Sequence, residues 1–233
     1  MPESSRSLEI KKIFPDHTGR IITALSNVGF FERSVLIGSW AMFCYGVTLG
    51  VKWRLHTGDI DLAVQVIPGG KRSKVDLEKV LQEAGATSFF SSADGLIRFS
   101  IPDYRIEFIV HDSKGGRKRE SEIVTISDLN INAQPLPSIR MLLDFSERVD
   151  ADDFYVRIPL PEAFFVHKLI IAQRRQRGGK RLKDLGQCEA LSEFIQDEKL
   201  QQVIQAQKIG KDTRKKIRTS CNSINFEFDR LGI

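Results

Sequence analysis

The sequence predicts an α+β protein, in which a mixed β-sheet flanked by helices is followed by an all-helical segment. Short apolar runs bounded by glycine or proline alternate with amphipathic stretches over the first two thirds of the chain. Beyond Pro159 and Pro161, helical spacing of the apolar residues dominates. The chain has 233 residues, enough for one large domain or two small ones. We therefore expect one domain over residues 1–157 and a helical C-terminal domain over residues 158–233.

The first elements come from a change in apolar spacing. Apolar residues recur at helical spacing over residues 19–28, which predicts a helix. The apolar run at 34–37 has the length of a buried strand and ends at Gly38 and Ser39. Residues 40–49 then predict a second helix, with Ser39 as its N-cap.

The middle of the chain predicts most of the sheet. Residues 60–66 indicate a strand that is ended by the turn sequence at 68–70, and residues 73–84 are amphipathic at helical spacing. Two further strands are expected at 96–101 and 104–111, joined by Pro102 and Asp103. The segment 113–120 is rich in glycine and charge and predicts a mobile loop, and residues 123–156 have a β-like composition.

Four helices are expected in the C-terminal part, over residues 164–176, 182–196, 200–209 and 213–231. Residues 174–181 form a dense basic cluster, Arg-Arg-Gln-Arg-Gly-Gly-Lys-Arg, beside these helices. Such a cluster fits binding to a nucleic-acid backbone, and it fits a solvated helix end and loop equally well.

Composition limits the kind of protein without naming its ligand. A net charge of +5 is compatible with a polyanionic ligand and also with a solvated basic surface. The three cysteines lie far apart and form neither a disulfide framework nor a zinc-ligand spacing. The first residues lack the apolar run of a signal peptide, and no run is long enough for a membrane span. We expect a cytoplasmic protein without membrane association.

Two aspartates carry the clearest chemical signal. Asp59 and Asp61 are two residues apart in a predicted strand, so their side chains project from the same face. Adjacent carboxylates repel each other unless a cation lies between them, and hard oxygen ligands suit Mg²⁺ or Mn²⁺. The alternative is a surface turn after Gly58 that the two aspartates cap.

Glu107 is the candidate for a third acid. It lies between Ile106 and Phe108 in an otherwise apolar strand, where an unpaired carboxylate is costly. A metal site shared with the two aspartates would remove that cost. An ion pair with Arg105, on the same face, is the alternative.

Gly38 and Ser39 indicate a phosphate-binding turn. A glycine between a strand and a helix lets the backbone approach a phosphate closely, and the free N–H groups of the helix N-terminus face the same anion. The Ser39 hydroxyl adds a hydrogen-bond donor.

Taken in order, Ile37-Gly38-Ser39, Asp59-Ile60-Asp61 and Ile106-Glu107-Phe108 resemble the pattern of the DNA-polymerase-β-like nucleotidyltransferase superfamily. The resemblance covers residues 34–110 and is closest to the bacterial minimal and abortive-infection types. It implies a nucleotidyltransferase-type sheet as the catalytic domain over 1–157, an NTP donor such as ATP or GTP, and Mg²⁺ or Mn²⁺ as cofactor.

A weaker resemblance extends into the helical part. Residues 164–168 and the pair Lys183-Asp184 are similar to elements that help to hold nucleotide phosphates in the abortive-infection type. This implies that Lys168 and Lys183 bind phosphate and that Asp184 orients them. Solvated lysines on helix faces are the alternative.

The reaction that the resemblance implies is transfer of a nucleoside monophosphate from an NTP to a hydroxyl, with release of pyrophosphate. Asp59 and Asp61 would hold two metal ions, and Glu107 would contact one of them and serve as general base. The acceptor stays open between a small molecule, a protein hydroxyl and a tRNA end. The alternative function is a catalytically inactive module with the same fold that binds nucleic acid or a protein partner.

Overall fold

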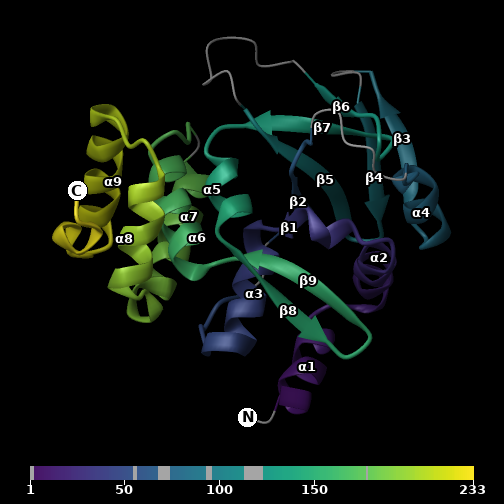
Figure 1. Ribbon diagram of the computed structural model, residues 1–233, viewed down its shortest axis with the longest axis horizontal. Coiled ribbons are helices and arrows are strands. Elements are labelled where there is room, and N and C mark those ends of the chain that lie inside the picture. Colours follow the sequence, from purple (N-terminus) through teal and green to yellow (C-terminus); the bar gives the residue numbers. More distant parts are fainter. Residues whose placement is uncertain (1–2, 55–56, 68–73, 93–95, 113–122, 177) are drawn as a thin grey trace.

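The computed structural model describes residues 3–54, 57–67, 74–92, 96–112, 123–176 and 178–233. Within these residues a mixed β-sheet is flanked by helices, and the C-terminal helices pack at one side of it (Figure 1). This architecture confirms the predicted α+β fold class. The turn expected at 68–70, the loop expected at 113–120 and Arg177 lie outside the described residues.

The described part of the main sheet has the strand order β1-β2-β5-β4-β3. Strand β7 adds to the far half of β5 and pairs with β6 on its other side. Strands β1 and β2 are antiparallel, whereas β2 and β5 are parallel. The strands are β1 Ser34–Leu36, β2 Asp59–Val64, β3 Thr87–Ser91, β4 Leu96–Ile101, β5 Tyr104–His111, β6 Val124–Ile126 and β7 Ile131–Leu136.

Helices and a separate hairpin enclose this sheet. The hairpin consists of β8 Ser146–Ala151 and β9 Phe154–Pro159. The α-helices are α1 Glu3–Lys12, α2 Asp16–Asn27, α3 Gly38–Leu49, α4 Leu77–Glu83, α5 Ile139–Asp144, α6 Pro161–Ala172, α7 Gly178–Leu191, α8 Asp197–Ala206 and α9 Lys211–Ser223. Short 3-10 turns lie at Phe30–Glu32, Ser192–Phe194 and Phe228–Leu231.

Strands β4 and β5 have the predicted bounds, and α3 begins earlier than predicted. The N-cap of α3 is Ile37, so the prediction that Ser39 caps this helix is wrong. Gly38 adopts a left-handed backbone with φ of 67°, which turns the chain into the helix immediately after the strand. Ser39 therefore lies inside the first helical turn.

Other boundaries also differ from the predicted ones. Strand β2 ends at Val64, two residues early, and the helix expected over 73–84 is reduced to α4. Asp76 caps α4, because its side chain accepts a hydrogen bond from the Lys79 N–H at 3.2 Å. The β-like region after residue 123 contains α5 as well as strands, and α1 and β3 were not predicted.

The sheet buries apolar residues on both faces. One face carries Ile60, Leu62, Ile106 and Phe108 into a large core shared with α2 and α3. The other carries Ala63 and Ile109 into a small cluster with α5. Since side chains alternate along a strand, residues 59, 61, 105 and 107 share the face of Ala63 and Ile109.

The N-terminal and C-terminal parts share one hydrophobic core. Buried residues from α2 through α9 belong to a single continuous cluster. In addition, the Tyr45 hydroxyl of α3 donates a buried hydrogen bond of 2.7 Å to the Pro159 carbonyl, directly before α6. The division into a domain over 1–157 and a helical domain over 158–233 stays a prediction. None of the described helices has both the length and the apolar character needed to cross a membrane.

Candidate functional site

The three predicted acids lie on adjacent strands and on one face of the sheet. Parallel pairing of β2 with β5 makes Asp61 the direct partner of Glu107 and Asp59 the partner of Arg105. The three acidic side chains are all partly exposed. The surface-turn alternative for the two aspartates is wrong, because both belong to β2.

Two arginines already contact the outer acids. Nη2 of Arg105 lies 3.0 Å from Oδ1 of Asp59, and Nη1 of Arg98 lies 3.7 Å from Oε1 of Glu107. The sequence alternative paired Arg105 with Glu107, and the structure corrects this partner. The parallel register places Arg105 beside Asp59, and Arg98 of the neighbouring strand reaches Glu107 instead.

Asp61 has the most perturbed acid–base behaviour of the three. Burial, and next the charge of Glu107, raise the pKa of Asp61 to about 6. Lys168 and Lys183 act on it in the opposite direction. Burial and the charge of Asp59 likewise raise the pKa of Glu107. The site therefore holds carboxylates whose mutual repulsion an added cation would relieve.

Gly38 is in direct contact with this acid. A Cβ at position 38 would overlap with Oδ2 of Asp61, and the left-handed φ also favours glycine. The Ile37 N–H donates to the Asp61 carbonyl at 3.0 Å, which fixes the start of α3 against β2. Ser39 is 2% exposed, and its hydroxyl has no hydrogen-bond partner among the described residues. The N-terminus of α3 thus opens beside Asp61.

The helical part brings a buried lysine to the same place. Lys168 of α6 is 7% exposed, and its Nζ donates to Oδ1 of Asp184 at 2.7 Å. Nε of Arg175 donates to the other oxygen of Asp184 at 2.9 Å. Burial alone would raise the pKa of Asp184, but its two cationic partners outweigh burial and lower it. Asp184 therefore orients Lys168 as expected, and the solvated alternative is wrong for this lysine.

Lys183 and the basic cluster also face the acids. Burial, and next the charge of Lys168, lower the pKa of Lys183, while Asp61 and Asp59 raise it. Lys180, at the start of α7, lowers the pKa of Glu107. The cluster at 174–181 thus acts on Glu107 through Lys180 and contacts Asp184 through Arg175, and sequence reasoning had not assigned these two residues to the site.

The acids fit a divalent cation in donor chemistry and strand placement, but their side chains are not gathered around one point. Among the residues that the structure describes, no group of three or more His, Cys, Asp or Glu is arranged to hold a metal ion. Asp59 is instead paired with Arg105, its direct partner across the two strands. Metal binding by Asp59, Asp61 and Glu107 stays a prediction.

Fold and site together define an α+β protein with strand carboxylates beside a helix N-terminus and a buried lysine, a combination suited to phosphate groups and their counter-cations. A family model described as nucleotidyltransferase matches residues 16–209, and the chain belongs to this family. The superfamily resemblance is thereby confirmed, and the abortive-infection type stays a prediction. No curated protein is significantly similar to the chain in sequence.

Solved structures resemble the chain only in part. An antigenic nucleotidyltransferase-like protein from Paracoccidioides brasiliensis shares 12% identity at a TM-score of 0.48, over 93% of this chain and 87% of that one. The antibiotic-resistance factor ANT(2'')-Ia shares 16% identity at a TM-score of 0.39, over 88% and 91%. A tRNA nucleotidyltransferase solved with a primer tRNA and an ATP analogue shares 12% identity at 0.24, over 89% and 62%.

Proposed function

We propose that this protein transfers a nucleoside monophosphate from an NTP, such as ATP or GTP, to a hydroxyl acceptor with release of pyrophosphate. Family membership supports nucleotidyl transfer in general. The observation that carries the proposal for this chain is the contact between Gly38 and Asp61. It joins a helix N-terminus suited to phosphate to a sheet face suited to cations.

The triphosphate would lie between α3 and α6. The N–H groups at Gly38 and Ser39 face it, and the buried Ser39 hydroxyl would gain the partner that it lacks among the described residues. Lys168 and Lys183 would bind phosphate oxygens from the other side. Because Asp184 already holds Lys168 in place, little side-chain ordering remains when the nucleotide binds.

Asp59, Asp61 and Glu107 would hold Mg²⁺ or Mn²⁺. When bound, the metal would neutralise the triphosphate and lower the pKa of the acceptor hydroxyl. Glu107 would accept the proton of that hydroxyl, since its raised pKa brings it closer to neutral pH. Arg105 would have to release Asp59 for all three acids to act together.

The first prediction tests Asp61. Asp61→Asn keeps the shape of the side chain and removes its charge, so Mg²⁺-dependent NTP binding and transfer should fall about 100-fold or more. Calorimetry with ATP and GTP, with and without Mg²⁺, measures binding. Transfer is measured with NTP labelled at the α-phosphate, incubated with total tRNA and with protein.

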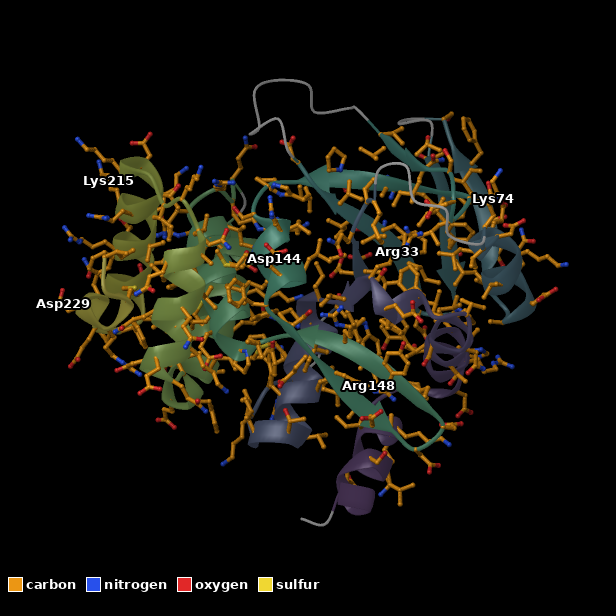
Figure 2. All side chains as sticks on the ribbon, in the orientation of Figure 1. Arg33, Lys74, Asp144, Arg148, Lys215 and Asp229 are labelled. Atoms are coloured by element: carbon orange, nitrogen blue, oxygen red, sulfur yellow. The ribbon has the colours of Figure 1, made fainter. Side chains whose placement is uncertain are left out.

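The matched control is Asp229→Asn. Asp229 lies at the far edge of the helical part, away from the sheet (Figure 2), and its loss should leave NTP binding and turnover unchanged. NTP binding that is equal in both variants and independent of metal would refute the proposed function.

The arginine pairs favour a second candidate function, a non-catalytic module that binds nucleic acid or protein. Asp59 and Glu107 are already paired to arginines, so two of the three acids are charge-compensated without metal. This candidate requires polyanion binding that Asp61→Asn does not alter.

The three described cysteines are free and buried, which suits the reducing cytoplasm that we propose as the location.

A further inference from the structure

The face of the sheet that carries the acids continues beyond Glu107 onto β4 and β3. Phe99 of β4 pairs with Ile106 on the buried face, so Arg98 and Ser100 lie on the face of Glu107. In β3, Phe89 is the direct partner of Arg98. A row of side chains therefore crosses four strands in the order Asp61, Glu107, Arg98, Phe89.

Phe89 is unusual for its position. Its large apolar side chain is 43% exposed. It lies on the same face as the three acids and beside the partly buried Arg98. Helix α4, which packs on β3, also packs on α2 and thus belongs to the opposite, buried side of the sheet. Among the described residues, α4 is the one helix that packs appreciably on β3 or β4.

The direction of the reaction decides what this surface can hold. On the proposed function, the triphosphate lies on the side of Asp61 that carries α3 and α6. Attacking and leaving oxygens are roughly in line in phosphoryl transfer, so the acceptor must approach from the opposite side. That side is the row Glu107, Arg98, Phe89.

The chemistry of this row selects an anionic acceptor with a flat ring. Arg98 and Arg105 would repel a cationic acceptor once a metal had neutralised the acids, whereas a guanidinium binds phosphate well. An exposed phenylalanine offers a stacking surface to any base. Strands lie about 4.8 Å apart, so Phe89 is roughly 10 Å from Glu107, close to the length of one nucleotide with its phosphate.

We propose that the acceptor is the single-stranded 3′ end of a nucleic acid, whose terminal nucleotides stack on Phe89 and contact Arg98 through phosphate. This inference rests on the proposed function and adds the class of acceptor to it. The terminal 3′ hydroxyl oxygen would form the new bond to the α-phosphorus. The bond to the bridging oxygen of pyrophosphate would break, and Glu107 would take the hydroxyl proton.

The test compares two neighbouring phenylalanines. Phe89→Ala should weaken binding of fluorescent single-stranded RNA or DNA between about 5-fold and 150-fold, the range expected for one lost base stack. Phe90→Ala is the matched control, because Phe90 is 68% exposed but points to the other face of β3. It should bind as the wild type does. Separate RNA and DNA arms show which polymer is preferred.

A second measurement tests the phosphate contact. Arg98→Gln should reduce the slope of log affinity against log salt by about 0.7, the value for one phosphate of a single strand. Mg²⁺-NTP affinity should stay at the wild-type value in Phe89→Ala.

Three results would overturn the inference. These are equal oligonucleotide affinity in the wild type, Phe89→Ala and Phe90→Ala, no oligonucleotide binding at all, or weakened NTP binding in Phe89→Ala, which would place the donor base there. If NTP binding still depends on Asp61 in any of these cases, the proposed function survives and only the acceptor assignment falls. If the wild type does not bind NTP, both the proposed function and the acceptor assignment are refuted.

Discussion

Gly38 is the residue on which the site geometry depends most directly. It meets two separate demands, a left-handed backbone and the absence of a Cβ beside Asp61. The first demand is common in turns, and other residues meet it at a cost of 1–2 kcal/mol. The second is specific to this site, because the overlap is with a carboxylate that the chemistry requires.

A pair of glycine variants separates these demands. Gly38→Ala should lose about 1–2 kcal/mol from backbone strain and a further amount from the overlap with Asp61, and it should bind NTP weakly. Gly50→Ala has the same strain, with φ of 83°, but a Cβ there would meet nothing within 4 Å. Urea unfolding and calorimetry measure both effects. If the two variants are equally stable and bind NTP equally well, the contact with Asp61 has no functional weight.

At the scale of elements, α6 and α7 are joined by a buried charge network. Lys168 and Asp184 are both nearly inaccessible, so removal of Asp184 leaves Lys168 buried and charged without its ion-pair partner. Asp184→Ala should therefore lower the free energy of unfolding by about 3–5 kcal/mol. Asp144→Asn, which breaks the exposed pair of Asp144 with Arg140 on α5, should cost less than about 1 kcal/mol.

A double variant distinguishes stability from function in this network. Lys168→Met with Asp184→Leu replaces the ion pair by apolar side chains and should recover most of the lost stability. It should not recover NTP binding, because no cation remains at position 168. Recovery of both would show that Lys168 has no role with phosphate.

The elements also show how far local sequence determines this fold. Pro102-Asp103 between two apolar runs fixed the bounds of β4 and β5, and strand period alone placed Asp59 with Asp61. The segment 139–144 was missed as a helix, because six residues are too few to separate a buried helix from a strand by period. Strand β3 was missed because its side chains are mostly exposed and show no apolar alternation.

Partners across the sheet could not be predicted in the same way. The two-residue alternation of side chains along a strand determines which face a residue lies on. It does not determine the register of two strands far apart in sequence, so Arg105 was paired with the wrong acid. The burial of Lys168 likewise depends on Asp184 and Arg175 of the segments that follow α6. Resemblance to a family indicated Lys168 and Asp184, and only the fold shows that Arg175 also holds Asp184.

At the scale of the whole molecule, the buried His167 makes the stability of the fold sensitive to acid. It is buried on α6, and Nδ1 lies 3.2 Å from the Ser138 carbonyl. Burial, and next the charge of Lys168, lower the pKa of His167 to about 3. The unfolded chain binds a proton near pH 6.5 and the folded chain does not, so stability present above pH 6.5 is lost as the pH falls toward 3.

The His167→Asn variant should lack this part of the acid response. The wild type should lose about 2 kcal/mol from this group between pH 7 and pH 5, and the variant should not, because asparagine does not titrate. Urea titrations at both pH values measure the difference. His111→Asn, at an exposed site on β5, is the matched control variant. An unchanged pH dependence in His167→Asn would mean that the ring is not neutral when buried.

The hydrogen bond from Tyr45 to Pro159 has a consequence for how a nucleotide is received. It fixes α3 to Pro159, the residue that leads into α6. The first turn of α3 would bind the phosphates, and α6 carries Lys168. Helices α3 and α6 are thus held together before a nucleotide binds. We therefore expect nucleotide binding to require little relative movement of α3 and α6, and we expect selectivity among ligands to depend on the residues at the mouth of the site.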